Sequence, residues 1–293
     1  KEQAAKISGI KNVKWLSEFP VIFRQLMCEL ENVYLNANEH QRADTTVETR
    51  DNRFIRDCRK RFPLHHYHRL APLMHELRSV KSPYEIDAIK SACDLTGKGF
   101  KRALKCVKPG VNETEVEAVF AHEFIRHKGQ FAYSPIIAAG ANNNILHYGQ
   151  NDQVCKKGDL LLLDVAAGLG NYMSDLTRTI PVSGRFTRRQ KQVYNAVLRI
   201  FRAQVAALVP GKTTKDLRTE CEERTAKECV DLGLLKMSEI KKQKPDEPAV
   251  KKFFMHGVSH PIGLDVHYVT YNHFKIEPGW VLTVEPAIYL KDE

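Results

Sequence analysis

The sequence of 293 residues contains no apolar run close to the roughly 18 residues that a membrane-spanning helix needs. Its N-terminal segment, K-E-Q-A-A-K, lacks the apolar core of a signal peptide. The seven cysteines form no C-x-x-C pair and no metal-knuckle spacing, and an odd, dispersed set is typical of reduced thiols. These absences argue against a membrane protein and a disulfide scaffold, and we expect a cytoplasmic protein.

Acidic residues are in deficit: 45 Lys and Arg against 35 Asp and Glu give a net charge of +10. Such a balance can indicate a nucleic-acid or anionic-surface partner. The positive charges are scattered, however, and no dense spot interleaves aromatic residues as a base-stacking platform does. We interpret the charges as solvated helix faces and loops, and expect neither nucleic-acid nor membrane partners.

The chain changes character near residue 80. In residues 1–80, a mixed α/β pattern predicts a helix over 21–30 and a short strand over 31–35. The histidines of this region lack carboxylate partners, and we interpret them as surface or interdomain residues; they are His65, His66, His68 and His75.

From residue 83 onward, helical patterns come in two pairs, each followed by β segments. Ser82 and Pro83 predict the start of a helix that runs to about residue 104. The other helices are predicted at 112–127, 188–208 and 213–232, strands at 131–148 around an Asn-rich turn, a Lys/Pro-rich loop at 237–252, and more strand after 253. This α-α-β repeat predicts one α+β domain.

A candidate site begins in residues 160–179, L-L-L-L-D-V-A-A-G-L-G-N-Y-M-S-D-L-T-R-T. The leucines predict a buried strand that ends at Asp164, and the Gly/Asn reversal predicts a hairpin whose second arm carries Asp175. With the turn centred between Leu169 and Gly170, the carboxylates face each other directly, with Cβ atoms roughly 4.5–5.5 Å apart. Such a pair needs a shared proton or a cation. Alternatively, each Asp caps backbone N–H groups at its turn.

Histidines and a further carboxylate follow near the C-terminal end. His256 and His260 share one face in extended geometry, which Pro261 favours over a helix. Glu285 ends the apolar run V-L-T-V, as Asp164 ends the leucine run. Hard oxygen ligands with one imidazole suit Mn²⁺, Co²⁺ or Zn²⁺. Bridging carboxylates suit two ions ~3.5–4 Å apart with a shared hydroxide as nucleophile.

These residues resemble the pita-bread metallopeptidases, the superfamily of methionine aminopeptidase, prolidase, aminopeptidase P and creatinase. The motifs L-L-D, S-D-L-T-R-T, G-V-S-H-P-I-G and V-E-P-A-I-Y carry the resemblance over residues 80–293, and H-G-x-S-H-x-x-G-L-D-V-H is the aminopeptidase P form. The resemblance implies an α+β pita-bread fold with pseudo-twofold α-α-β repeats around a curved antiparallel sheet. Residues 81–293 would form this catalytic domain, truncated at its C-terminal end, after a remnant of a smaller α/β creatinase-type N-terminal domain at 1–80.

The resemblance also implies a role for each candidate residue. The metal ligands would be Asp164, Asp175, His260 and Glu285, which would hold two divalent ions, most simply Mn²⁺, with Co²⁺ or Zn²⁺ as alternatives. The catalytic residues would be His147, His256 and Glu285, and the substrate-binding residues Tyr133 and His267.

Two departures from the family pattern stand out. The fifth ligand of the family lies beyond E-P-x-I-Y in a G-x-R-x-E pattern, which this sequence does not contain; Asp292 and Glu293 come too early. A second ion would therefore lack one bridging carboxylate, which implies an inactive chain unless the natural chain continues. The family usually has an acidic residue after V-H, where this chain has Tyr268.

The function implied by the resemblance is that of an Xaa-Pro aminopeptidase. This metal-dependent exopeptidase would release the N-terminal residue from peptides with proline second, through a metal-bridged hydroxide. One alternative is a prolidase that acts on Xaa-Pro dipeptides. Another is a non-enzymatic relative that binds RNA or protein, which the charge and the missing ligand favour and the four retained ligands oppose. The sequence leaves a homo-oligomer open.

Overall fold

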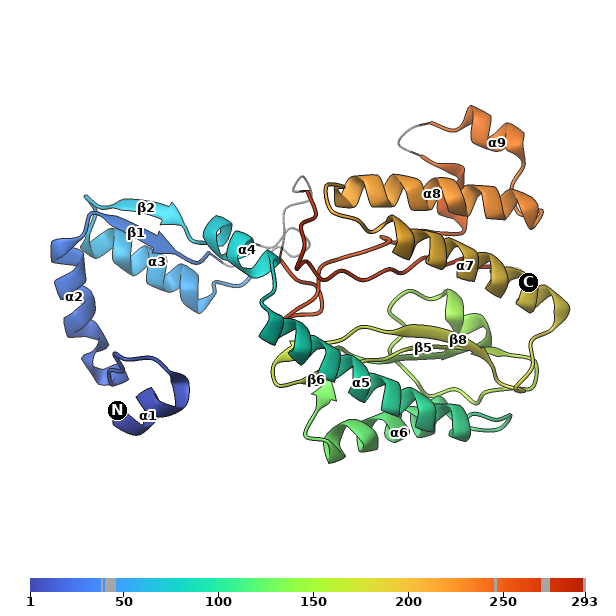
Figure 1. Cartoon of the computed structure of the whole chain (residues 1–293), viewed down its shortest axis with the longest axis horizontal. Helices are drawn as coiled ribbons and strands as arrows, with labels where there is room; N and C mark the ends of the chain where they lie inside the picture. Colours follow the sequence, from blue (N-terminus) through green and yellow to red (C-terminus); the bar gives the residue numbers. More distant parts are fainter. Residues whose placement is uncertain (38, 40–45, 245–246, 270–274, 292–293) are drawn as a thin grey trace. The chain divides into compact units, whose positions relative to one another are not determined.

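The structure is a computed structural model that describes residues 1–37, 39, 46–244, 247–269 and 275–291. The chain forms two compact units, Lys1–Leu77 and Arg78–Glu293, a division close to the boundary expected at residue 80. Figure 1 labels many of the helices and strands of the two units. Among the described residues, no helix has the length and apolar character needed to span a membrane.

The first unit combines a parallel strand pair with packed aromatic rings. Its elements in order are α1 (Glu2–Ser8), η1 (Leu16–Glu18), α2 (Phe19–Glu29), β1 (Asn32–Leu35), α3 (Arg50–Arg61), β2 (His66–Arg69) and α4 (Ala71–Ser79), which continues into the second unit. The expected helix and strand are present as α2 and β1. Phe23 of α2 packs on Phe54 of α3 and on Phe62, with ring centroids 5.4 and 6.1 Å apart.

The histidines of the first unit make structural contacts. The His65 ring nitrogen Nε2 lies 2.6 Å from the carbonyl oxygen of Met27, and that of His68 lies 3.0 Å from Asn32 Oδ1. Among the described residues, none of these histidines joins a group of potential metal ligands.

Two capped helices open the second unit. α5 (Pro83–Cys106) begins after Ser82 with Pro83 in its first turn, as the sequence predicts, and Ser82 also forms a capping box with Glu85. Asn112 and Glu115 cap α6 (Glu113–Arg126) in the same way. The two helices pack side by side on one side of the strands in Figure 1.

The strands of the second unit form two small antiparallel sheets. One contains β4 (Ile136–Ala139), β5 (Leu160–Asp164) and β8 (Thr177–Pro181), and the other β3 (Gln130–Phe131), β6 (Ala167–Leu169) and β7 (Tyr172–Met173). Alternate leucines of β5, Leu161 and Leu163, are fully buried against Phe120 and Phe124 of α6. The core therefore fixes β5, and with it the position of Asp164 at its end.

The hairpin is present, but its predicted register is wrong. Asp164 pairs with Thr177, and the turn consists of Gly170 and Asn171. Both turn residues have positive φ, +58° and +68°, as a two-residue type I′ turn requires. Asp175 is therefore the diagonal neighbour of Asp164 on the same face, and not its direct partner.

The predicted strand that carries His147 is also wrong. Residues 140–144 form a 3₁₀ turn, η2 (Gly140–Asn144), and His147 follows it with φ +56°. That left-handed conformation ends any strand. The loop is held by Glu113, whose buried carboxylate accepts from Tyr148 Oη at 2.9 Å and from Ala139 N at 2.7 Å.

A second helix pair follows. α7 (Arg188–Ala207) and α8 (Thr214–Asp231) match the prediction and pack against each other (Figure 1). The stretch predicted as a loop at 237–252 instead contains α9 (Met237–Lys242) and η3 (Ala249–Lys252). Ile200 of α7 and Cys221 of α8 pack with Phe254 and Val258, so the C-terminal segment lies against this helix pair.

The segments after residue 253 are less regular than the predicted strands. Within the described residues, their pairing is limited to one isolated antiparallel bridge between Pro261 and Leu282. Ile262 N nevertheless donates to Val281 O at 3.2 Å, and Thr283 N donates to His260 O at 2.9 Å. The two segments therefore run antiparallel.

The type I′ turn gives the first testable prediction. Gly170→Ala places a side chain at φ +58°, and we expect it to lower the free energy of unfolding by roughly 1–2 kcal/mol. The matched control is Gly97→Ala inside α5, where a new Cβ meets nothing within 4 Å. That change should stabilise by about 1 kcal/mol. Urea unfolding measures both, and equal effects of the two changes would contradict the turn assignment.

Candidate metal centre

The first two candidate ligands lie on the hairpin. Asp164 is the last residue of β5, and Asp175 lies between β7 and β8. The hydroxyl of Tyr133 lies between their carboxylates: it donates to Asp164 Oδ1 at 2.5 Å and lies 3.3 Å from Asp175 Oδ1. Tyr133, expected to bind substrate, thus contacts two candidate metal ligands.

The electrostatics of this pair follow from burial. Burial raises the pKa of Asp164 to about 6; the Tyr133 hydrogen bond opposes the rise and the charge of Asp175 adds to it. Burial, together with the charges of both carboxylates, raises the pKa of Tyr133 well above its usual range. The phenol therefore remains a donor, and its proton partly compensates the two crowded carboxylates.

The other two candidate ligands come from the antiparallel C-terminal segments. Glu285 N donates to Val258 O at 2.8 Å, which sets Glu285 beside the His260 segment. The hydroxyl of Thr283 accepts from His260 N at 3.0 Å and donates to Glu285 Oε1. Thr283 therefore orients both residues at once.

Three candidate ligands converge. His260 Nε2 lies 3.3 Å from Asp175 Oδ2 and 3.1 Å from Glu285 Oε1. One donor atom from each residue lies within 4.8 Å of the other two, the only such group among the described residues. Asp164 joins this group through Tyr133 and Asp175. Two carboxylates and an imidazole at this spacing fit a divalent cation by donor chemistry.

The ionisation of the group is coupled. Burial opposes a charge on His260, but the hydrogen bonds that His260 Nε2 donates to the carboxylates of Asp175 and Glu285 outweigh it and raise the His260 pKa to about 10. Burial likewise acts to raise the pKa of Glu285, yet the hydrogen bond and charge of His260 lower it overall. His260 is thus a cation held by two anions, and a bound metal would have to displace its proton.

The remaining predicted residues lie at different distances from this group. The ring of His267 contacts that of His260, with centroids 4.5 Å apart at an interplanar angle of 73°. Nε2 of His256 lies 3.1 Å from Tyr289 Oη. His147 is exposed, and the described part of the chain pairs it with none of the other candidate residues. Asp292 and Glu293 lie outside the described residues.

Thr283 and Tyr289 are site neighbours that the sequence motifs did not indicate. Both lie in the motif around Glu285, in V-L-T-V-E-P-A-I-Y, and Thr283 shares a face with Glu285 by strand alternation. Burial and the charges of Asp164 and Glu285 raise the pKa of Tyr289 to about 12. Strand alternation could have identified Thr283.

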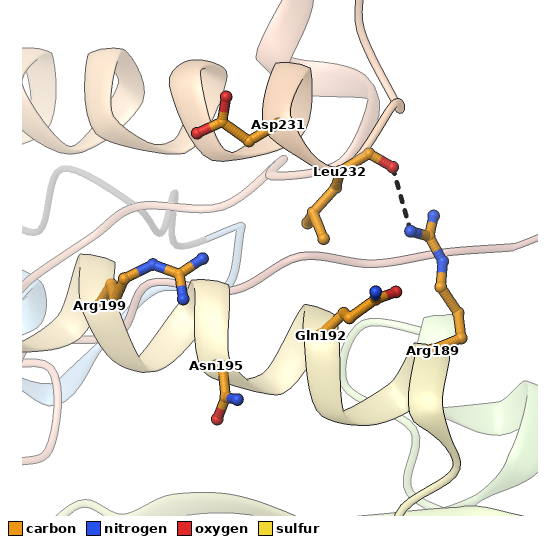
Figure 2. Close-up of a pocket in the computed structure, with 6 residues that line it drawn as sticks. All are labelled: Arg189, Gln192, Asn195, Arg199, Asp231 and Leu232. Atoms are coloured by element: carbon orange, nitrogen blue, oxygen red, sulfur yellow. Dashed lines mark hydrogen bonds between the residues drawn. The ribbon is translucent and has the colours of Figure 1, made fainter.

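A separate pocket of about 380 Å³ lies between α7 and α8 (Figure 2). Its lining residues are Arg189, Gln192, Asn195, Arg199, Asp231 and Leu232, and none is a candidate ligand. Arg199 forms two hydrogen bonds with Glu228, at 2.6 and 2.8 Å, and Arg189 Nη1 donates to the Leu232 carbonyl at 3.0 Å. Both guanidinium groups therefore already have hydrogen-bond acceptors within the protein.

Comparisons with known proteins show which family the chain resembles. A model of metallopeptidase family M24 matches residues 87–293. The chain is 34% identical over 301 residues to an Xaa-Pro aminopeptidase of Haemophilus influenzae, covering 100% of this chain and 66% of the relative. It is 32% identical over 248 residues to an Xaa-Pro dipeptidase of Homo sapiens, covering 76% of this chain and 50% of the relative.

The fold comparison points the same way. Zinc-substituted aminopeptidase P of Escherichia coli in complex with product superposes with a TM-score of 0.85 at 31% identity, covering 99% of this chain and 67% of that chain. The expected α+β class and pita-bread fold are thereby confirmed. The chain spans about two thirds of the length of the Haemophilus influenzae relative, 66%.

The coupled ionisation predicts how stability depends on pH. Because the His260 pKa is about 10 in the folded protein and 6.5 when unperturbed, the folded state binds the extra proton between these values. The free energy of unfolding of chelator-treated protein should therefore fall as pH rises from about 6.5 to about 10. His260→Gln should flatten this dependence, whereas His66→Gln, at an exposed site, should keep it. Urea unfolding across this range is the measurement, and an equal pH dependence in His260→Gln would refute the assignment.

Proposed function

The chain belongs to metallopeptidase family M24, and from that premise we propose that it is a metal-dependent exopeptidase that releases the N-terminal residue from peptides with proline second. The observation that carries the proposal is the convergence of Asp175, His260 and Glu285 from the hairpin and the C-terminal segments. A binding module has no need of a buried group of two carboxylates and an imidazole. The donor chemistry of this group suits metal-assisted hydrolysis.

The metal would be held by Asp164, Asp175, His260 and Glu285. Hard carboxylate oxygens outnumber the single imidazole, so we propose Mn²⁺ as the natural ion, with Co²⁺ and Zn²⁺ able to bind the same set. Bound divalent ions would lower the pKa of a water and polarise the scissile carbonyl. For Asp164 to bind, its carboxylate must exchange the Tyr133 hydrogen bond for the ion.

The residues around the ligands would bind substrate and move protons. Glu285, oriented by Thr283, would accept a proton from the attacking water and pass it to the proline nitrogen as the bond breaks. His256, oriented by Tyr289, would stabilise the oxyanion. His267 would line the substrate site beside His260. His147 is exposed on its loop and would contribute to the site only when substrate is bound.

The setting would be reducing and cytoplasmic. All seven cysteines are free, and four of them are buried in the core. Free thiols in such numbers are typical of a cytoplasmic protein.

Peptide hydrolysis tests the function. With Mn²⁺ added, the protein should release the first residue from Xaa-Pro peptides of three or more residues. Glu285→Gln should lower kcat/KM by about 10²–10⁴-fold, the usual weight of a general base. Glu277→Gln, at an exposed glutamate, is the matched control and should leave the rate unchanged.

The same assay separates the alternatives. Cleavage restricted to Xaa-Pro dipeptides would identify a prolidase, the activity named for the Homo sapiens relative. RNA or protein binding with no hydrolysis under any metal would identify a non-enzymatic relative and refute the proposal.

Metal binding gives an independent prediction. Because an ion must displace the His260 proton, affinity for Mn²⁺ should rise with pH below about 10, by about tenfold per pH unit for one proton. Calorimetry in two buffers of different ionisation enthalpy counts the released proton. His260→Gln should abolish that release, and His122→Gln, a histidine outside the site, should retain it. Binding without proton release in the unaltered protein would show that His260 is not a ligand.

A further inference from the structure

The residues 261–268 form a closed loop that joins two candidate histidines. His260 precedes the loop, His267 lies near its end, and Tyr268 N donates to Pro261 O at 3.0 Å to close it. Gly263 lies against the Tyr268 ring so closely that a Cβ there would come within 2.8 Å of the ring. The Tyr268 ring thus packs against the inside of its own loop.

Two cationic side chains contact the Tyr268 ring. The guanidinium carbon of Arg78 lies 4.3 Å from the Tyr268 ring centroid, and the Lys81 ammonium lies 4.6 Å from it, both within cation–π range. Arg78 Nε also donates to Tyr268 Oη at 2.8 Å, and Arg78 Nη2 to Asp265 Oδ2 of the same loop at 3.1 Å. Tyr268 and Lys81 are both buried, so water competes little for these contacts.

The loop is also tied to the rest of the site. Met173 N, two residues before Asp175, donates to Gly263 O at 2.8 Å. Lys81 N donates to Gly279 O at 2.8 Å, on the segment that leads to Glu285. The Tyr268 ring therefore lies where the hairpin, the start of α5 and the C-terminal segments meet.

We propose that Arg78, Lys81 and Tyr268 form a cation–π clamp whose task is to position His267 against His260. The clamp fixes the end of the loop one residue after His267, and the contact between the two imidazole rings is the geometry it maintains. Tyr268 is thus a positioning residue that acts through His267. The substrate consequence rests on the proposed peptidase function, whereas the ring geometry does not.

The test compares two changes at Tyr268 in the full chain. Tyr268→Leu removes both cation–π contacts, and we expect KM for an Xaa-Pro peptide to rise about tenfold, with kcat changed less than about twofold. The nuclear Overhauser contact between the His260 and His267 rings should disappear. Tyr268→Phe keeps the ring and loses a single hydrogen bond, so KM should rise only about two- to threefold.

Tyr172→Phe is the matched control. Its hydroxyl also donates to a charged side chain at the start of α5, Glu85 at 3.1 Å, but lies outside the loop. This change should leave KM and the histidine contact as they are.

Two results would overturn the clamp. One is a folded Tyr268→Leu protein whose KM and whose contact between the His260 and His267 rings equal those of the unaltered protein. If that protein differs only in a lower melting temperature, Tyr268 is a purely structural residue. If Tyr268→Leu does not fold, Arg78→Gln must reproduce the KM rise and the lost contact, with Arg78→Lys restoring part of both, or the proposal fails. An unaltered protein that cleaves no peptide removes the proposed function, while the histidine contact still decides the clamp.

Discussion

The structure depends on how three carboxylates are neutralised at the edge of a hydrophobic core. Asp164, Asp175 and Glu285 lose much of their hydration, and unpaired charges there would be costly. The phenol proton of Tyr133 and the imidazolium of His260 compensate them. Both protons point at oxygens that a divalent cation would use. A proton and a metal would therefore compete for one set of oxygens and one imidazole nitrogen.

This arrangement requires both halves of the second unit. Asp164 and Asp175 are positioned by the core of α5, α6 and β5, whereas His260 and Glu285 lie on segments packed against α7 and α8. The first half supplies two carboxylates without an imidazole, and the second half pairs the imidazole of His260 with one carboxylate, that of Glu285, at 3.1 Å. The α-α-β repeat expected from the sequence thus bears on the candidate site, because each repeat supplies one part of the candidate ligand set.

Much of this could be predicted because local patterns agree with the fold. Ser82 and Pro83 mark the start of α5, and apolar runs mark the approach to Asp164 and to Glu285. The prediction of a strand at His147 is wrong because the sequence of an Asn-rich segment does not show which residue adopts a positive φ. The ladder around His260 is irregular because Pro261 lacks a backbone donor. Alternation with Glu285 marks Thr283, whereas the contacts of Tyr289 and Tyr268 join distant segments, which a single sequence does not encode in any local spacing.

The register of the hairpin shows why such details matter. Direct opposition would have set the Cβ atoms of Asp164 and Asp175 about 4.5–5.5 Å apart, whereas diagonal neighbours lie about 7–8 Å apart. The wider spacing admits the Tyr133 oxygen between the carboxylates, at 2.5 and 3.3 Å. A bridging ion needs similar room. The turn residues Gly170 and Asn171, remote from any chemistry, therefore set the gap in which the chemistry can take place.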